Sequence, residues 1–349
     1  MTGGPLPPDD ARSLTTGFRA ALGAGRPALV GPAVAADDRE AFARSVDRGL
    51  GARPPRLECR YLYDAEGSRL YEAITALDEY YLTRTEAALL ARHADEVRRR
   101  VGATTLVELG SGSSAKTSYL LDAWARAARP VRYVPVDVSA SALEGAARSL
   151  CPDRPWLEWI GLHASHDQAF PLLRTVSPAT VAFLGSSIGN LDDAELDAFL
   201  AQLAAALAPG DHFLVGVDLV KDPAVLEAAY DDGAGVTAAF TRNLFARMNR
   251  ELDAGLDVTA FAHEARWEPA REQVEIHARV LRDQVLVLPS LDRRHHLPAG
   301  TRIRVEICRK FRLGPLGDRL RAAGLATVAT WTDPPGWFAL LLLRREVAR

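Results

Sequence analysis

Residues 106–117 read Leu-Val-Glu-Leu-Gly-Ser-Gly-Ser-Ser-Ala-Lys-Thr, and this stretch decides the fold. Its first part ends a short apolar run at 105–109, and its second part opens a segment with helical periodicity. Glycines at 110 and 112 let the backbone turn sharply and pass close to a ligand, and a helix start offers unpaired N–H groups. The stretch therefore predicts a strand, a glycine turn and a helix, with a ligand bound over the turn.

The same alternation of strand and helix continues along the chain. Short apolar runs at 131–138, 156–162, 180–185 and 212–219 are bounded by Gly, Pro, Asp or Ser, and the segments between them have a period near 3.6. Strands that are almost continuously apolar and separated by helices are typical of a parallel sheet covered on both faces. A helix near 313–323 and two more runs, 325–332 and 337–345, predict that an antiparallel hairpin closes this sheet.

Residues 221–310 have a different pattern, which predicts an inserted α+β unit. The segment 228–252 predicts one long helical region. Polar and apolar residues then alternate in several runs up to 311, as in an antiparallel sheet with one wet face.

Two further predictions concern the chain before the first strand of the parallel sheet. Thr83-Arg84-Thr85-Glu86 predicts a capping box at the start of a helix. The Gly- and Pro-rich segment 1–30 is expected to be flexible.

Charge and cysteine content exclude several classes of protein. The net charge of −3, from 42 basic and 45 acidic residues, provides no basic surface for a nucleic acid. Cys59, Cys151 and Cys308 have no paired spacing, which argues against a disulfide framework and against a zinc site. The first residues do not resemble a signal peptide, and the longest apolar run is too short to span a bilayer. We expect a cytoplasmic protein with no metal and no membrane or nucleic-acid partner.

Two classes of enzyme use a glycine turn of this kind. Gly110-x-Gly112-x-x-Ala115 satisfies the pattern of nicotinamide-dependent oxidoreductases. Glu108 gives the alternative Glu-x-Gly-x-Gly form, which resembles motif I of class I methyltransferases. Asp137, which ends the second strand and can accept from ribose hydroxyls, is common to both classes. The predicted closing hairpin and the absence of a convincing proton donor for hydride chemistry favour the methyltransferase.

Several further motifs together resemble one family, the L-histidine Nα-methyltransferases of ergothioneine biosynthesis. The resemblance runs from about residue 55 to 345 and rests on these segments: Tyr63-Asp64-Ala65-x-Gly67-Ser68, Glu79-Tyr80-Tyr81-x-Thr83-Arg84-Thr85-Glu86, LVELGSGSSAKT, FLGSSIGNL at 183–191, DLVKD at 218–222, AYDDGAGVTAAF and WTDPPGWFAL. It implies an α/β fold, a class I methyltransferase Rossmann-like sheet with a terminal antiparallel hairpin plus an α+β substrate-binding domain. The expected substrate-binding domain comprises 31–83 and 221–310, and the expected domain for S-adenosylmethionine comprises 84–220 and 311–349.

The resemblance also implies roles for individual residues. The residues expected at the S-adenosylmethionine site are Glu108, Gly110, Gly112, Lys116, Asp137, Ser165 and His166. The residues expected at the amino-acid site are Tyr80, Gly185, Asn190, Tyr230, Glu306, Cys308 and Ile276. Asn190 and Tyr230 would bind the substrate carboxylate, Glu306 would bind an imidazole, and Tyr63 would orient the amine as the catalytic residue. The expected product is the trimethyl betaine hercynine, made by a monomer from a free amino acid.

Four positions depart from the family pattern. Cys308 replaces a serine, Ile276 a methionine, Thr241 an asparagine and Ser165 an acidic residue near the adenine. A thiol is a weaker hydrogen-bond partner than a hydroxyl, so Cys308 and Ile276 leave tryptophan or tyrosine open as alternative substrates. Ser165 leaves open a protein that binds S-adenosylmethionine without turnover. A local alternative for Asn190 is that it caps the next helix.

Overall fold

A computed structural model of the chain describes residues 8–25, 27–31 and 38–347. The chain divides into two compact units. Among the described residues, unit 1 contains 38–81 and 221–309, and unit 2 contains 8–25, 27–31, 82–220 and 310–347. In the described residues no helix is long and apolar enough to cross a membrane.

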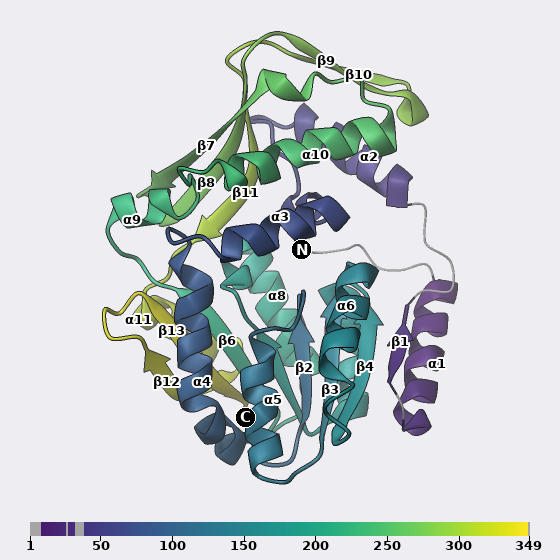
Figure 1. Ribbon diagram of the computed structural model, residues 1–349, viewed down its shortest axis with the longest axis vertical. Coiled ribbons are helices and arrows are strands. Elements are labelled where there is room, and N and C mark those ends of the chain that lie inside the picture. The colour runs from purple at the N-terminus through teal and green to yellow at the C-terminus, as the bar shows by residue number, and fades with distance from the viewer. Residues whose placement is uncertain (1–7, 26, 32–37, 348–349) are drawn as a thin grey trace. The chain divides into compact units, whose positions relative to one another are not determined.

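Unit 2 is built on an eight-stranded sheet with the order β1-β4-β3-β2-β5-β6-β13-β12 (Figure 1). Its strands are β1 (Ala28–Val30), β2 (Thr105–Leu109), β3 (Val131–Asp137), β4 (Leu157–His163), β5 (Ala179–Phe183), β6 (His212–Asp218), β12 (Leu325–Thr332) and β13 (Phe338–Arg345). Neighbouring strands are parallel from β1 to β6, and β13 is antiparallel to both β6 and β12. This order, with the closing hairpin, is the class I methyltransferase fold, so the fold predicted from the sequence is confirmed.

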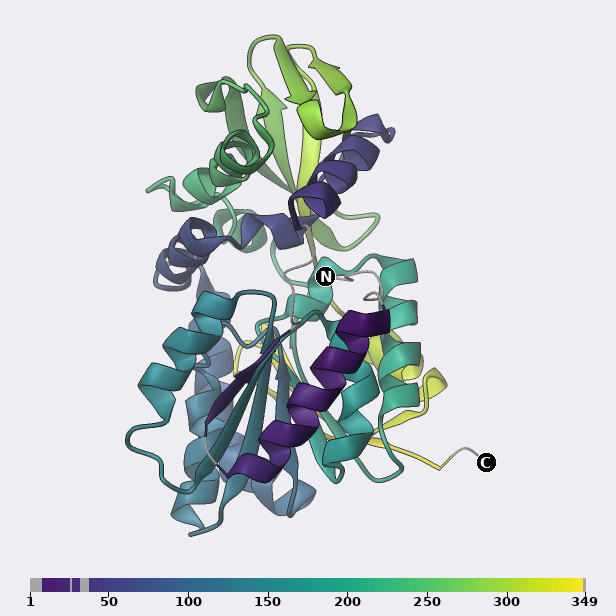
Figure 2. The ribbon, with the colours of Figure 1, turned by 90° about the vertical axis from the view of Figure 1, so that its right-hand side faces the viewer.

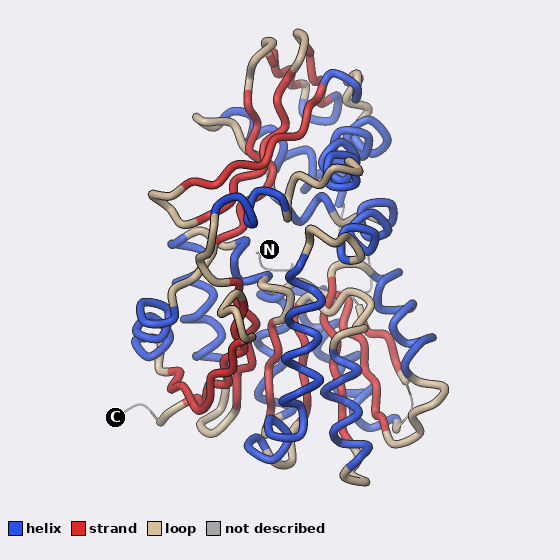
Figure 3. Tube along the Cα trace, turned by 60° about the vertical axis from the view of Figure 1, so that its left-hand side comes forward, coloured by secondary structure: helices blue, strands red, loops and turns tan. Residues whose placement is uncertain are grey.

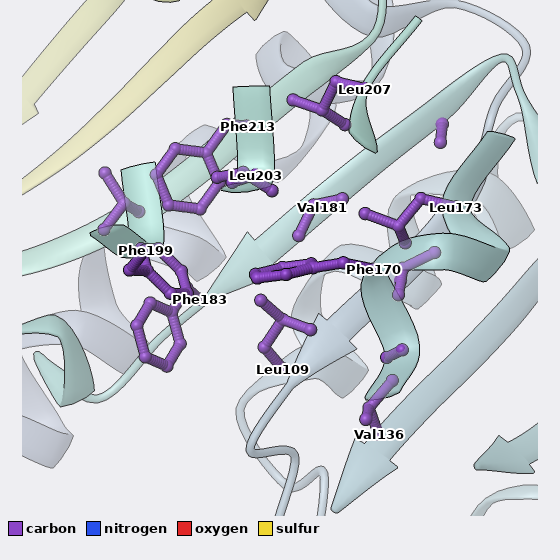
Figure 4. Packing of buried hydrophobic residues seen from close by; sticks show 14 of the residues in the cluster. Leu109, Val136, Phe170, Leu173, Val181, Phe183, Phe199, Leu203, Leu207 and Phe213 are labelled. Atoms are coloured by element: carbon purple, nitrogen blue, oxygen red, sulfur yellow. The ribbon is translucent and has the colours of Figure 1, made fainter. Parts of the chain in front are cut away.

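Helices cover both faces of this sheet. They are α1 (Pro8–Ala24), α4 (Tyr81–Val101), α5 (Thr117–Arg126), α6 (Ala140–Leu150), α7 (His166–Ala169), α8 (Asp193–Ala206) and α11 (Leu313–Ala322). In Figures 1 and 2, α4, α5 and α6 lie on one face and α8 on the other. The core under α1, α8 and α11 includes a group of aromatic rings, of which Phe170, Phe183, Phe199 and Phe213 are drawn in Figure 4. Burial on two faces explains why the central strands are apolar throughout.

The N-terminal segment differs from the expectation of a flexible stretch. Residues 8–24 form α1, and Ala28–Val30 pairs in parallel with β4 at the edge of the sheet. Leu14 and Phe18, four residues apart, are buried in the core, and this spacing places them on one helix face. The expectation is therefore wrong for these residues, while residues 1–7 and 26 lie outside the described part of the chain.

Unit 1 contains an antiparallel sheet with helices beside it. Its helices are α2 (Asp38–Gly51), α3 (Ala65–Thr75), α9 (Pro223–Ala228) and α10 (Val236–Leu252), and its strands are β7 (Phe261–Glu268), β8 (Gln273–Val280), β9 (Gln284–Leu288), β10 (Arg293–Leu297) and β11 (Arg302–Arg309). The order β11-β8-β7 makes one sheet, and β10-β9 makes a separate ribbon. Figure 3 shows these strands in red and the neighbouring helices in blue. Helix α10 packs on both α3 and β7.

The helical region predicted at 228–252 is broken in the structure. Helix α9 ends at Ala228 and α10 begins at Val236. Between them the Asp232 carboxylate accepts hydrogen bonds from the backbone N–H of Val236 at 2.9 Å and of Thr237 at 2.7 Å. Gly235 adopts φ +76° in the same turn. Side-chain capping and a left-handed glycine end one helix and start another, which periodicity alone does not reveal.

Candidate active site

The glycine turn after β2 has the geometry that the sequence predicts. Gly110 and Gly112 adopt φ of +66° and +51°, which favour glycine. A Cβ atom placed on Gly112 would meet no protein atom within 4 Å, so open space lies above the turn. The Ser111 hydroxyl is buried and has no hydrogen-bond partner among the described residues. Open space beside a buried polar atom fits the ligand expected here, S-adenosylmethionine.

Asp137 faces the same turn from the end of β3. Its two carboxylate oxygens accept hydrogen bonds from the backbone N–H groups of Gly112 and Ser139, each at 2.8 Å. Burial raises the pKa of Asp137 above its usual range, although these hydrogen bonds oppose the change. A carboxylate oxygen can accept more than one hydrogen bond, so Asp137 keeps acceptor capacity for ribose hydroxyls. The residues at this turn therefore fit the nucleoside part of S-adenosylmethionine.

Glu108 contacts protein groups close to the turn. Its carboxylate accepts from the Tyr133 hydroxyl, which also lies 2.8 Å from the Ser114 hydroxyl. Glu108 is only 3% exposed, and burial raises its pKa from 4.5 to about 7, while the hydrogen bond from Tyr133 acts in the opposite direction. These contacts describe a residue that supports the glycine turn. Direct contact between Glu108 and the cofactor stays a prediction.

The raised pKa of Glu108 predicts a pH-dependent stability. Between pH 4.5 and about 7 the folded protein holds a proton on Glu108 that the unfolded chain releases. The stabilising contribution of the Glu108 carboxyl is therefore complete below pH 4.5 and is lost as the pH rises to about 7. Over this range the free energy of unfolding falls by an amount on the order of 3 kcal/mol. Glu108→Gln should thus stabilise the protein at about pH 8 and much less at about pH 5. Thermal unfolding of both proteins at the two pH values measures this, and an equal difference at both would contradict the assignment.

Lys116 and Gly185 meet at a third residue, Glu86. The Lys116 ammonium contacts the Glu86 carboxylate, and the Gly185 backbone N–H donates to both Glu86 oxygens at 2.9 and 2.8 Å. The sequence motif around Glu86 predicted a capping box with Thr83, and that prediction is wrong. Helix α4 begins at Tyr81, so both residues lie inside it and the Glu86 side chain is fully buried.

Asn190 ends a short 3-10 helix at Ser187–Asn190 in the loop after β5. The cap of helix α8 is Asp192, whose carboxylate accepts from the Glu195 backbone N–H at 3.0 Å. The alternative in which Asn190 is merely the cap of this helix is therefore wrong. Its position after β5 agrees with a ligand-binding role, because ligands of parallel sheets bind at the carboxyl ends of the strands.

Ser165 and His166 begin the short helix α7 after β4. The His166 ring packs edge-on against Phe183 and Phe199, with centroids 5.1 and 6.0 Å away. Burial lowers the pKa of His166 to about 3, so the imidazole is neutral at physiological pH. The structure places this ring against the aromatic core, and cofactor binding by Ser165 and His166 stays a prediction.

Unit 1 brings together a cluster of aromatic side chains, called here the aromatic cluster: Tyr63, Tyr71, Tyr80, Tyr230 and Phe240. Tyr63 packs edge-on against Tyr71 and Phe240, with centroids 5.5 and 5.4 Å apart. Tyr80 packs edge-on against Tyr230 at 5.9 Å. The sequence indicated three of the five, while Tyr71 and Phe240 were missed because an aromatic residue on a helix is usually an ordinary core residue.

Three residues of the sheet lie at this cluster. Burial raises the pKa of Tyr63, and the charge of the Glu306 carboxylate raises it further. Cys308 acts in the same direction on both Tyr63 and Tyr80, whose pKa values are raised mainly by burial. Ile276 on β8 pairs directly with Glu306 on β11. Tyr80, Tyr230, Glu306, Cys308 and Ile276 belong to unit 1, whereas Gly185 and Asn190 belong to unit 2, and the roles of these residues in binding an amino acid stay predictions.

Tyr230 is held through His263, a residue that the sequence gave no reason to select. His263 Nε2 lies 2.7 Å from the Tyr230 carbonyl oxygen, and His263 Nδ1 lies 2.8 Å from the Thr241 hydroxyl. A carbonyl only accepts, so Nε2 carries the hydrogen and Nδ1 accepts from Thr241. The hydroxyl of Thr241, one of the departures from the family pattern, is thus used inside unit 1 to support Tyr230.

Comparison with known proteins agrees with this geometry. Residues 42–345 match the family model described as "Histidine-specific methyltransferase, SAM-dependent". The histidine N-alpha-methyltransferase of Mycolicibacterium smegmatis is 43% identical over 88% of this chain and 95% of its own length. That of Mycobacterium tuberculosis is 42% identical over 86% and 94%. Ergothioneine biosynthesis protein 1 of Neurospora crassa is 31% identical over 80% of this chain and 32% of its own length.

These matches extend over most of the chain, and the range of the family model, 42–345, spans the positions of the glycine turn, Asp137 and the aromatic cluster. They exclude the nicotinamide-dependent oxidoreductase that the glycine pattern left open. The chain belongs to the family of histidine-specific, S-adenosylmethionine-dependent methyltransferases.

Proposed function

We propose that this enzyme methylates the α-amino group of free L-histidine and repeats the transfer until the trimethyl betaine, hercynine, is formed. The observation that carries the proposal is the half-buried Glu306 carboxylate on β11, in a chain that matches the histidine-specific family over residues 42–345. A carboxylate beside aromatic rings suits an imidazole, which offers an N–H donor on a flat ring. The two mycobacterial relatives named for histidine methylation support the same substrate.

The two units would divide the work of binding. S-adenosylmethionine supplies a methyl group that is already activated by its sulfonium sulfur. In unit 2, Gly110, Gly112, Lys116 and Asp137 would bind this donor. Unit 1 would serve as the substrate-binding domain, with Glu306 on the imidazole. Tyr230, together with Asn190 of unit 2, would bind the carboxylate.

Tyr63 would orient the amine without removing its proton. Burial and the neighbouring Glu306 hold the pKa of Tyr63 well above its ordinary value, so its hydroxyl stays protonated at neutral pH. A neutral hydroxyl oxygen accepts a hydrogen bond from the amine and directs the nitrogen lone pair. Only the neutral amine has that lone pair, so proton loss to solvent precedes transfer. The remaining catalytic contribution of the site is proximity, orientation and the exclusion of water.

An amino acid whose amine or carboxylate is blocked tests this assignment. The enzyme should methylate histidine, fail to methylate Nα-acetylhistidine, and methylate histidine amide with a much higher KM. The first analogue lacks a nucleophilic amine, and the second lacks the charge that Asn190 and Tyr230 would bind. Mass spectrometry of the products with each compound gives the answer. Methylation of Nα-acetylhistidine on its ring would contradict transfer to the α-amine.

Tryptophan or tyrosine is the second candidate substrate, because of Cys308 and Ile276. Cys308 is 6% exposed and Ile276 is 3% exposed, so neither can turn freely to solvent. A thiol where the family has a hydroxyl weakens one hydrogen bond, and a branched chain in place of a methionine changes the pocket shape. Both changes leave Glu306 in place, which favours histidine.

Cys308→Ser is expected to lower the KM for histidine about fivefold, because a recovered hydrogen bond contributes about 1 kcal/mol. Steady-state kinetics with histidine, tryptophan and tyrosine would measure the effect, with Cys151→Ser, in unit 2, as the control. An unchanged KM for histidine together with a loss of activity on tryptophan or tyrosine would support the second candidate instead.

The cellular setting follows from the same proposal. Hercynine is the betaine expected in ergothioneine biosynthesis, and a free amino acid and S-adenosylmethionine are both metabolites of the cytoplasm. We therefore place the enzyme there, as a monomer that needs no partner protein. Gel filtration with light scattering tests the monomer.

A further inference from the structure

Glu86 connects two loops at the carboxyl ends of neighbouring strands. It lies on α4 and is fully buried. One loop follows β2 and carries Lys116, whose ammonium contacts a Glu86 oxygen. The other follows β5 and carries Gly185, whose N–H lies 2.9 and 2.8 Å from the two oxygens. Strands β2 and β5 are adjacent and parallel, so one carboxylate reaches both loops.

The surroundings of Glu86 are shaped to receive its carboxylate. A Cβ atom on Gly216, in the middle of β6, would lie 1.9 Å from Glu86 Oε1. A Cβ atom on Gly185, whose φ is +76°, would lie 3.2 Å from Lys116 Nζ. Gly216 thus leaves room for the Glu86 carboxylate, and Gly185 leaves room for the Lys116 ammonium.

We propose that Glu86, itself fixed by the Gly185 N–H, is a positioning residue that holds Lys116 in the arrangement that binds S-adenosylmethionine. A buried carboxylate is stable only when it is paired and hydrogen-bonded, and here both conditions are met by groups of the two loops. An ammonium that a buried carboxylate already holds in place loses less conformational freedom when a ligand binds, which reduces the ordering cost of binding. The inference rests on the proposed role of Lys116 at the cofactor site.

Calorimetric titration with S-adenosylmethionine alone, without amino acid, tests the inference on the full chain. Glu86→Gln keeps the shape of the side chain and removes its charge. It should weaken binding about tenfold or more, the effect of losing a charge-assisted contact. Lys116→Met should also weaken binding, and adding Glu86→Gln to Lys116→Met should weaken it little further, because Glu86 acts through Lys116.

Asp211→Asn is the matched control. Asp211 is a buried carboxylate in the same unit, and it accepts from the backbone N–H of Ala179 at 2.9 Å and of Ala208 at 2.8 Å. Asp211 precedes β6, whereas Gly185 follows the neighbouring parallel strand β5. The two residues therefore lie at opposite ends of the sheet. Asp211→Asn should lower the thermal midpoint and leave the affinity for S-adenosylmethionine unchanged.

Gly216→Ala provides a second route if Glu86→Gln folds poorly, because its Cβ atom displaces the carboxylate without removing it. Folded Glu86→Gln or Gly216→Ala protein that binds S-adenosylmethionine as tightly as the wild type would overturn the inference. Fully additive effects of Glu86→Gln and Lys116→Met would also overturn it. If Lys116→Met leaves the affinity for S-adenosylmethionine unchanged, Lys116 does not bind the donor and the inference about Glu86 is wrong. If that variant still methylates histidine, the proposed function is not contradicted by this result.

Discussion

Glu306→Ala is expected to lower kcat/KM for histidine about 100-fold and to leave the affinity for S-adenosylmethionine unchanged. Glu306 is half-buried beside Ile276, and its charge raises the pKa of Tyr63, so its carboxylate would meet the imidazole in a half-buried site. A hydrogen bond to a charged group contributes about 1.5–3 kcal/mol, and 2.7 kcal/mol corresponds to about 100-fold. Initial rates over a range of histidine concentrations measure the loss.

Glu264→Ala is the control for this variant. Glu264 is a carboxylate on β7 of the same sheet, and it pairs with Arg279 at 2.6 Å and Arg302 at 2.8 Å. Its removal should change stability without changing the KM for histidine. If Glu306→Ala retains the wild-type kcat/KM for histidine, the imidazole is not bound at Glu306 and the substrate assignment loses its main support.

Gly112→Ala is expected to weaken binding of S-adenosylmethionine about 100-fold, which is close to 3 kcal/mol. The added Cβ atom would occupy the open space above the turn, where the donor is proposed to bind. A non-glycine residue at φ +51° also costs roughly 1–2 kcal/mol of backbone strain. Calorimetric titration with S-adenosylmethionine separates the loss of affinity from the loss of stability.

Gly102→Ala is the matched control for the backbone strain. Gly102 adopts φ +70°, a Cβ atom there would also meet nothing within 4 Å, and it precedes β2 at the other end of the strand. Both variants should lose comparable stability, and only Gly112→Ala should lose affinity. Equal affinity in the two variants would mean that the donor does not lie over Gly112.

The parallel sheet was predictable because its signals are local. Strands β2 to β6 coincide within one or two residues with apolar runs bounded by Gly, Pro, Asp or Ser. Two-sided burial makes such runs continuous, and the glycine turn identifies where the ligand binds. The closing hairpin followed from two strongly apolar runs after the last helix. These features depend on neighbouring residues in the sequence, so a single chain reveals them.

The contacts that complete the site were not predictable in the same way. Glu86 has a local pattern typical of a capping box, yet it bonds to Gly185, which lies 99 residues away in sequence. His263 is one polar residue on an alternating strand, and only the folded chain brings it to Tyr230 and Thr241. Helix α1 was missed because its alanines and glycines hide the pair Leu14 and Phe18. In each case the role of the residue depends on a tertiary contact, and the neighbouring sequence does not indicate which residue makes that contact.

The most direct test of the central claim is a mass-spectrometric assay of the purified protein with S-adenosylmethionine and each free amino acid in turn. Histidine should gain up to three methyl groups, all on the α-nitrogen, and should be consumed far faster than tryptophan or tyrosine. A protein that binds S-adenosylmethionine but adds no methyl group to any free amino acid would contradict the claim, and so would one that methylates another amino acid in preference to histidine.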